Sequence, residues 1–149
     1  TGESEYLKNC WSYANKLEIH NYIIYQEKME QKYLSQIYEL ADFFILPTQY
    51  EIFGMVILEA MYYHTIVLTT NNGGSSTLIE NNQNGCIIEK INSKLWADKI
   101  QMLLKDTQQM NAIKNNAHDT IANLYTWDKL AFKFLDCYKN LNNKKEGEL

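Results

Sequence analysis

The chain alternates short apolar runs with longer stretches in which apolar residues recur every three or four positions. Four runs have the length and composition of β-strands, at residues 22–25, 43–46, 65–68 and 85–88. The runs at 43–46 and 65–68 are apolar at almost every position, which is typical of strands buried on both faces of a parallel sheet. The pattern therefore predicts a sheet whose interior strands are covered from both sides.

Helical periodicity occupies most of the remaining chain. It predicts helices at residues 4–17, 33–41, 54–63, 93–105, 108–124 and 127–141. Ser93 and Thr126 have the side chains of N-caps for the helices that follow them. Trp11, Trp96 and Trp127 fall on apolar stripes of helices, where packing in the core is favoured over stacking on a ligand.

Alternating strands and helices predict an α/β fold, a Rossmann-like, doubly wound parallel sheet with helices on both faces and a helical C-terminus. A doubly wound domain usually has five or six strands, so four strands indicate that the first strands are absent from this chain. We expect one domain over residues 1–141, incomplete at its N-terminus, and a frayed polar tail at 142–149. The strand at 43–46 is then expected to have an unpaired edge.

Composition excludes several classes of function. The 149 residues carry a net charge of −4, and all 14 basic side chains are lysine, so the arginine forks that read nucleic acids are absent. The longest apolar runs are far shorter than the roughly 20 residues of a membrane span. Cys10, Cys86 and Cys137 are few, widely spaced and odd in number, which predicts neither a disulfide framework nor a metal cluster. A reducing, cytoplasmic compartment fits best.

Candidate chemistry follows the strand at 43–46. A polar loop there runs from Pro47 to Gly54 and leads into an apolar helix that contains Glu59. A helix N-terminus offers free backbone N–H groups and a positive dipole end to an anion such as a diphosphate. Glu51 lies before this helix and Glu59 within it, and carboxylates accept hydrogen bonds from sugar hydroxyls. An anion site between two hydroxyl acceptors describes a nucleotide-sugar site.

This stretch resembles the E-x7-E signature of the group 1 glycosyltransferases, which have the retaining GT-B architecture. The signature reads EIFGMVILE at residues 51–59. The resemblance extends over nearly the whole chain, through ADFFILPT before the signature, LEAM at its end, NNGGSSTLIENNQNG after it, and Thr126-Trp127 at the start of the last helix. It implies that the chain is the C-terminal half of a GT-B fold, the donor-binding domain.

The resemblance also implies roles for individual residues. Glu51, the candidate catalytic residue, corresponds to the glutamate that contacts the hydroxyls of the donor sugar, and Glu59 to the one that binds the ribose. Backbone amides at the helix start meet the diphosphate in this family, which implies that role for Phe53 and Gly54, and Ile52 beside them is a further candidate for donor binding. The remaining candidates for donor binding are the weaker pair Tyr25 and Gln26, near the base, and the glycines Gly73 and Gly74.

Gly73 and Gly74 leave two alternatives open. They could form a turn that needs a positive φ, or they could let the backbone approach the donor sugar closely. Three positions depart from the family pattern. Ile52 and His64 stand where glycines are usual, and Ile66 where a proline usually precedes the strand. His64 is expected at a helix C-terminus, stabilised by the dipole.

The function implied is transfer of a hexose from a UDP- or GDP-sugar to a glycan or lipid acceptor in cell-surface polysaccharide synthesis, without a cofactor or metal. The family's basic pair for the diphosphate and its acceptor-activating groups lie in segments that this sequence lacks, so the chain alone is expected to be catalytically incomplete. Its expected partners are the nucleotide-sugar donor, the N-terminal acceptor-binding domain of the same enzyme, and a second copy at the sheet edge. We expect no nucleic acid and no transmembrane segment, with peripheral binding at the inner membrane face through the missing domain.

The alternative is a catalytically inactive, glycosyltransferase-like binding or partner module. Retention of both Glu51 and Glu59 favours a chain that still binds donor. A dinucleotide-dependent oxidoreductase is disfavoured, because no G-x-G-x-x-G follows any predicted strand.

Overall fold

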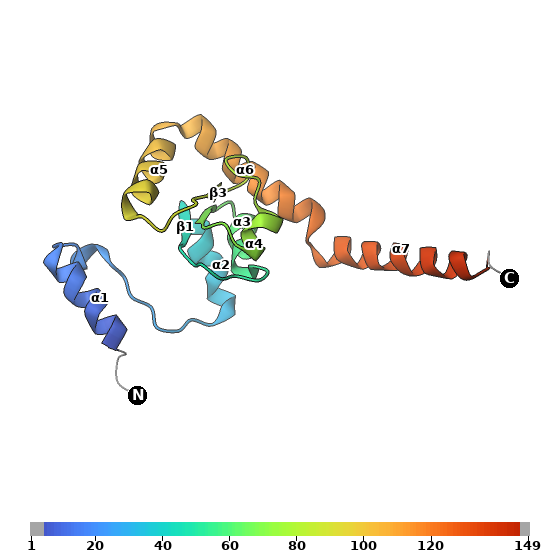
Figure 1. Ribbon diagram of the computed structural model, residues 1–149, viewed down its shortest axis with the longest axis horizontal. Coiled ribbons are helices and arrows are strands. Elements are labelled where there is room, and N and C mark those ends of the chain that lie inside the picture. The colour runs from blue at the N-terminus through green and yellow to red at the C-terminus, as the bar shows by residue number, and fades with distance from the viewer. Residues whose placement is uncertain (1–4, 147–149) are drawn as a thin grey trace. The chain divides into compact units, whose positions relative to one another are not determined.

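The structure, a computed structural model, describes residues 5–146 (Figure 1). By its contacts the chain divides into two units, Thr1–Gln31 and Lys32–Leu149. The elements in chain order are α1 (Glu5–Lys16), η1 (His20–Tyr22), α2 (Gln31–Leu40), β1 (Phe43–Leu46), α3 (Met55–Tyr62), β2 (Ile66–Thr69), α4 (Gly73–Leu78), β3 (Cys86–Ile87), α5 (Ser93–Lys105), α6 (Thr107–Leu124) and α7 (Trp127–Glu146). The single domain predicted over 1–141 stays a prediction.

The first unit contains α1, where the sequence predicts a helix. Ala14 is buried on its apolar stripe, and the ring of Trp11 on the same stripe meets the ring of Tyr25 edge-on, at 6.2 Å between centroids. The stripe is therefore covered by the segment that follows the helix within the same unit.

The strand predicted at 22–25 is wrong. Tyr22 ends the short 3-10 helix η1, and Ile24 is 95% exposed. Ile23 has extended backbone angles, φ −107° and ψ 122°, but no strand among residues 5–146 pairs with this segment. β-Branched and aromatic residues favour an extended backbone, whereas a strand also needs a ladder partner, and none is present here.

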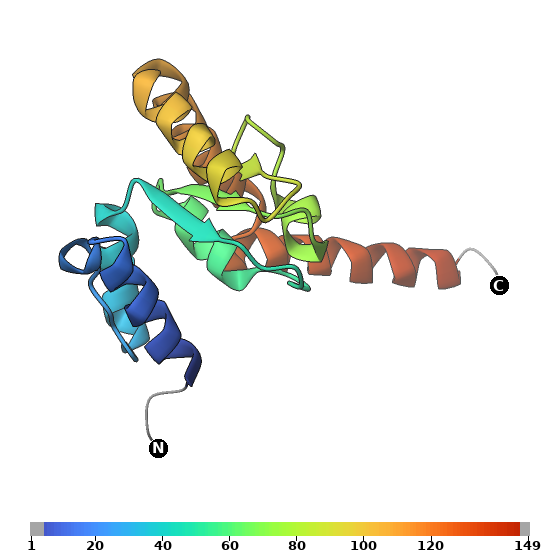
Figure 2. The same ribbon diagram turned by 60° about the vertical axis from the view of Figure 1, so that its left-hand side comes forward.

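The sheet contains three strands within the described residues, rather than the predicted four, and their order is β1-β2-β3. All pairs are parallel, with Phe43 opposite Ile66 and Leu68 opposite Cys86. β2 begins one residue later than predicted, at Ile66. In Figure 2, β1 is the turquoise arrow that leads into the loop before α3.

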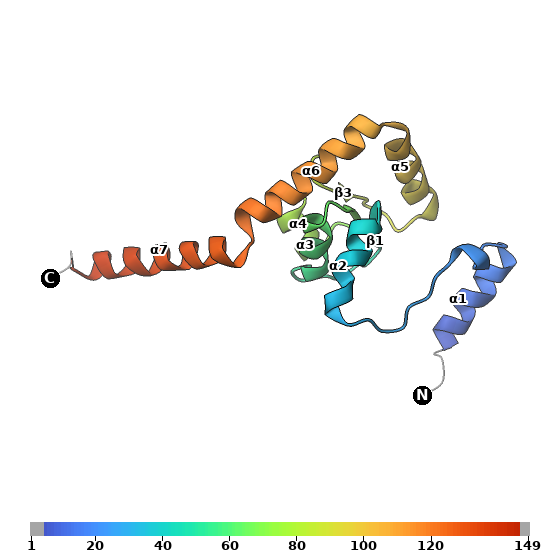
Figure 3. The same cartoon turned by 180° about the vertical axis from the view of Figure 1, so that it is seen from behind.

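Helices cover both faces of this sheet, as a doubly wound fold requires. Val67 of β2 packs in one core cluster with residues of α2, α3, α4 and α6. Its neighbours Ile66 and Leu68 pack in a second cluster, with α5 and the first part of α6. Figure 3 shows α2 and α3 on the near side of the sheet. Because successive side chains of a strand point to opposite faces, the buried pattern of β2 records a layer of helices on each side.

β1 lies at the edge of the sheet and, within the described residues, pairs with β2 alone. All of β2 is buried, whereas Ile45 of β1 is 48% exposed. An apolar groove of about 410 Å³ lies beside it, lined by Pro47 of the following loop and by Trp96 and Ile100 of α5, among others. The unpaired edge predicted for this strand is confirmed for the chain as described.

The predictions for the C-terminal helices need correction at the N-cap of α5, at Trp127 and at the end of α7. The N-cap of α5 is Asn92 rather than Ser93, because Asn92 has the extended backbone of a cap and its side chain accepts hydrogen bonds from the N–H groups of Lys94 and Leu95, at 3.0 and 3.2 Å. Trp127 is not in the core. It is 85% exposed in the first turn of α7.

α7 continues to Glu146, past the end predicted at Leu141, so the first part of the predicted tail is helical. The remainder of that tail, 147–149, lies outside the described residues. Across the helices of 5–146, none is both long enough and apolar enough to cross a bilayer.

Candidate functional site

The site forms where the loop after β1 enters α3. Gly54 is the N-cap of this helix and has left-handed backbone angles, φ 83° and ψ 51°. A Cβ at this position would lie 2.8 Å from Cδ1 of Ile57, so glycine suits both the angle and the space. The Gly54 carbonyl accepts hydrogen bonds from the N–H groups of Ile57 and Leu58, at 2.8 and 3.1 Å. Met55 and Val56 open the helix, and N–H groups at these first two positions have no acceptor within a helix, which makes them donors for an anion.

Glu51 caps this helix start with its side chain. Its Oε1 atom accepts a hydrogen bond from the N–H of Gly54 at 3.0 Å, and the side chain is half-buried. The contact fixes the carboxylate beside the α3 N-terminus, and Oε2 remains the oxygen that can face a ligand hydroxyl. Ile52 and Phe53 of the same loop are 74% and 45% exposed, so this loop presents apolar side chains next to its backbone amides.

A second loop, after β2, leads into α4, a helix that the sequence pattern did not predict. Asn72 is its N-cap and forms a capping box with Ser75, whose N–H lies 2.9 Å from Asn72 Oδ1. Gly73 and Gly74 open the helix, and neither has a positive φ, so the turn alternative is wrong. Asparagine, serine and threonine are common at helix N-termini, so the NNGGSST stretch at residues 71–77 could have indicated the start of α4.

The two loops are in direct contact. The N–H of Gly74 donates to the carbonyl oxygen of Glu51 at 2.9 Å. A Cβ on Gly74 would lie 2.8 Å from the carbonyl carbon and oxygen of Phe53, and one on Gly73 would lie 3.1 Å from the carbonyl oxygens of Glu51 and Ile52. In the structure these glycines therefore pack closely against the backbone of residues 51–54. An approach to the donor sugar stays a prediction.

Threonine hydroxyls add to this junction at the carboxyl ends of the strands. The hydroxyl of Thr69 donates to the carbonyl of Leu46 at 3.0 Å, and the hydroxyl of Thr70 donates to the carbonyl of Thr48. The sequence analysis did not single out these two threonines. Two threonines directly after a buried apolar run indicate side-chain hydrogen bonds at the end of the strand. Together they hold the β2 loop against the loop that carries Glu51.

Glu59 lies on α3 and its carboxylate has a protein partner. The hydroxyl of Tyr38, on α2, donates to Glu59 Oε2 at 3.3 Å. Tyr38 is buried, and burial together with the nearby negative charge of Glu59 and this hydrogen bond raises the pKa of Tyr38 to about 12. Sequence reasoning missed Tyr38, although a tyrosine on an apolar helix face usually finds a hydrogen-bond partner. The ribose contact of Glu59 stays a prediction.

Tyr25 and Gln26, predicted near the base, belong to the first unit. Tyr25 packs against Trp11, and Nε2 of Gln26 donates to the carbonyl of Lys28 at 2.9 Å. Their described contacts lie within their own unit, and a role in donor binding stays a prediction.

His64 follows α3, at the helix end predicted for it. Its φ is 58°, and the N–H groups of His64 and Thr65 donate to the carbonyls of Met61 and Ala60, at 3.2 and 3.0 Å. This pattern is a Schellman motif with histidine at the left-handed position where glycine is usual. The His64 ring stacks on His118 of α6, with centroids 4.1 Å apart.

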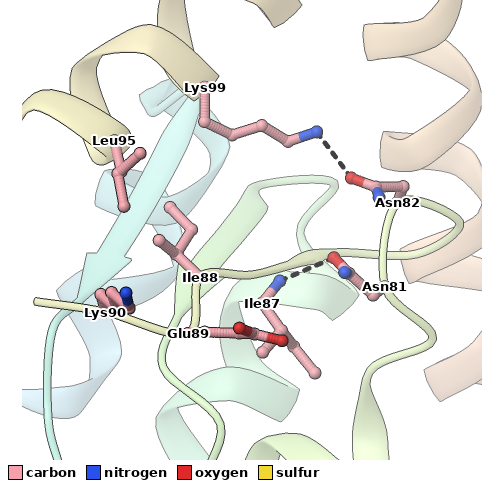
Figure 4. A pocket seen from close by; sticks show the side chains of 8 residues that line it. All are labelled: Asn81, Asn82, Ile87, Ile88, Glu89, Lys90, Leu95 and Lys99. Carbon is pink, nitrogen blue, oxygen red and sulfur yellow. Dashed lines mark hydrogen bonds between the residues drawn. The ribbon is translucent and has the colours of Figure 1, made fainter.

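A separate hollow of about 390 Å³ lies along β3 (Figure 4). Side chains from the loop before β3 and from α5 line it. Lys99 Nζ donates to Asn82 Oδ1 at 2.6 Å, and Asn81 Oδ1 accepts from the N–H of Ile87 at 2.9 Å. None of the predicted site residues lines this hollow. Within the part of the chain that is described, no three His, Cys, Asp or Glu side chains gather as metal ligands would.

Comparison with known proteins decides the family. The profile of the family described as "Glycosyl transferases group 1" matches residues 1–120. The chain belongs to this family. Among curated relatives, a D-inositol 3-phosphate glycosyltransferase of Corynebacterium urealyticum is 29% identical over 133 residues, 89% of this chain and 31% of the relative. The chain therefore spans about a third of the length of that relative.

Solved structures show the same fold. The C-terminal domain of the group 1 glycosyltransferase LpcC from Francisella tularensis matches with a TM-score of 0.76 and 24% identity, covering 83% of this chain and 64% of that domain. Anabaena Alr3699/HepE in complex with UDP-glucose matches with a TM-score of 0.82 and 23% identity, covering 93% of this chain and 38% of that protein. The parallel sheet and flanking helices are thus the Rossmann-like C-terminal domain of the GT-B fold.

Proposed function

We propose that this chain is the nucleotide-sugar-binding domain of a retaining glycosyltransferase. The whole enzyme transfers a hexose from a UDP- or GDP-sugar to a glycan or lipid acceptor in cell-surface polysaccharide synthesis. The observation that carries this proposal is the junction at the start of α3. There Gly54 is the N-cap of the helix, the Glu51 side chain accepts from the N–H of Gly54, and the N–H of Gly74, after the next strand, donates to the Glu51 carbonyl.

The donor binds along this junction in three parts. The diphosphate meets the N–H groups of the first turn of α3, where the helix dipole favours negative charge. The hydroxyls of the donor sugar donate to Glu51, and the ribose hydroxyls donate to Glu59 farther along the helix. Complexes of HepE with UDP-glucose and with UDP support uracil as the base to test first. No metal or cofactor is proposed for the step.

The acceptor side is supplied by a second, N-terminal domain of the same enzyme. The edge of β1 and the apolar groove beside Ile45 support pairing with a further strand, because an unpaired apolar edge exposes both backbone donors and acceptors. We propose that a strand from elsewhere in the same protein pairs with this edge of β1. The alternative is a second copy of the chain that pairs edge to edge. We place the enzyme in the cytoplasm, peripheral at the inner membrane face through its acceptor domain.

Titration calorimetry of the intact protein tests the donor site. UDP, GDP and the matching glucose and mannose nucleotides are compared at one salt concentration, and saturable binding of one base series is expected. A product assay with the sugar nucleotide that binds more tightly then distinguishes an active glycosyltransferase from an inactive binding module. Binding with hydrolysis or transfer supports the enzyme, binding without either favours the inactive binding module, and binding of neither base contradicts both.

A further inference from the structure

Tyr38 is anchored by three parts of the second unit. The edge of its ring meets Phe44 of β1, at 5.8 Å between centroids and 76° between planes. On another side the ring stacks on Tyr63, just past the end of α3, at 6.2 Å and 7°. Its backbone carbonyl accepts a hydrogen bond from the hydroxyl of Thr65 at 2.6 Å. Ring and backbone are therefore both fixed, which leaves the hydroxyl in a defined place.

The acceptor of this hydroxyl among residues 5–146 is the carboxylate of Glu59. The hydroxyl lies 3.3 Å from Oε2 of Glu59, and the Tyr38 side chain is only 8% exposed. A neutral phenol is a donor, and the raised pKa of Tyr38 keeps it neutral far above physiological pH. Glu59 lies between apolar residues in the sequence of α3, and this hydroxyl is the described hydrogen-bond partner of its carboxylate.

We propose that Tyr38 is a positioning residue for the donor site: its hydroxyl holds Oε2 of Glu59, so that Oε1 is presented to the ribose hydroxyls. This inference rests on the proposed function. A glutamate side chain has three rotatable bonds, and ordering it only when a ligand arrives costs binding free energy. A carboxylate held in advance by a rigid neighbour avoids that cost, as supporting hydrogen bonds do for ligating residues elsewhere.

The experiment removes the hydroxyl and keeps the ring. Tyr38→Phe preserves the contacts with Phe44 and Tyr63, and affinity is measured by calorimetry on the intact protein for UDP and for 2′,3′-dideoxy-UDP, which lacks both ribose hydroxyls. We expect Tyr38→Phe to weaken UDP binding about threefold to tenfold, the range for losing one hydrogen bond, and to leave dideoxy-UDP binding unchanged. In a Glu59→Ala background, Tyr38→Phe is expected to have no further effect.

Tyr63→Phe is the matched control, because it removes a hydroxyl from the ring stacked on Tyr38 and keeps the hydrogen bond between Tyr38 and the Glu59 carboxylate. It is expected to bind both ligands as the parent does. If Glu59→Ala weakens UDP binding and Tyr38→Phe does not, the positioning role is wrong while the donor site stands. Equal weakening of both ligands by Tyr38→Phe assigns Tyr38 to packing alone and also overturns the role. If the parent binds no nucleotide, the proposed function itself fails.

Discussion

The N–H of Gly74 donates a hydrogen bond to the carbonyl oxygen of Glu51 at 2.9 Å, and this bond joins the loops that follow β1 and β2. Parallel strands end at the same edge of a sheet, so their loops meet there. Here the two loops lie so close that the backbone carbonyl of Glu51 accepts a hydrogen bond from a glycine after the next strand. The position of Glu51 therefore depends on how closely these two loops pack.

Gly74→Ala tests that dependence. The new Cβ would lie 2.8 Å from the carbonyl group of Phe53 and 3.0 Å from the nitrogen of Gly54, and backbone atoms cannot turn aside as a flexible side chain can. We expect a stability loss of about 1–3 kcal/mol, the usual cost of overpacking, and a weaker affinity for UDP because the loop moves. Chemical denaturation and calorimetry measure the two effects.

Gly85→Ala is the control for a general loss of stability. Its Cβ would meet the side chain of Ile79 at 3.0 Å, away from the loop of residues 51–54. It should lower stability without changing UDP affinity at a temperature where the protein remains folded. A Gly74→Ala protein that keeps the parental affinity would show that the two loops need not touch for binding.

Glu51→Ala separates two roles of one side chain. The N–H of Gly54 loses its acceptor, so stability should fall by about 1 kcal/mol, as when a helix cap is removed. Affinity for UDP should change little, whereas affinity for the UDP-sugar should fall, because the proposed partner of Glu51 is the sugar. Glu51→Gln keeps an oxygen for Gly54 and should restore most of the stability. A loss of plain UDP affinity equal to that of Glu59→Ala argues against this division.

The sequence predicted the sheet interior and most helices because these follow from local patterns. Unbroken apolar runs located β1 and β2, and periodic apolar residues located α5 with both ends correct. The strand predicted at 22–25 is wrong because residue types indicate only that an extended backbone is favourable. They do not indicate whether a neighbouring strand is present to pair with it. Trp127 failed for a similar reason, since a helical stripe does not specify what covers it.

The candidate site shows the same division. Glu51, Gly54 and Glu59 were predicted as site residues from the order of strand, loop and helix, together with the family signature. The partner of Glu59 was missed, because Tyr38 lies on a different helix and the pairing depends on how α2 and α3 pack. Local sequence patterns do not predict contacts between elements that are far apart in the sequence.

His64→Gly tests the helix end at α3. A non-glycine residue at φ 58° is strained, so glycine should raise the free energy of unfolding by about 0.5–1 kcal/mol after its greater entropy in the unfolded chain is counted. His64→Ala is the control, because it removes the stacking on His118 and keeps the strain. Alanine should be less stable than the parent. A less stable glycine variant would mean that the stacked rings outweigh the backbone strain.

Stability at alkaline pH reports the environment of Tyr38. Its pKa is about 12 in the folded protein against an ordinary value of 10, because burial and then Glu59 disfavour the phenolate. The folded state therefore holds a proton that the unfolded state loses first, so this stabilisation is full below pH 10 and is lost as the pH rises from 10 to 12. The parent should lose more stability than Tyr38→Phe across that window. Parallel curves for the two proteins would place Tyr38 in an unperturbed setting.

The most direct test of the donor site is to observe its backbone amides while nucleotide binds. In a ¹⁵N–¹H spectrum of the isotopically labelled intact protein, titration with UDP should move the amide signals of residues 51–56 and 72–74 most, because the N–H groups at the start of α3 are the proposed donors to the diphosphate. Signals from the hollow along β3, such as those of Asn82 and Lys99, should stay in place. The largest shifts at that hollow, with residues 51–56 unmoved, would contradict a nucleotide-sugar site at the α3 N-terminus.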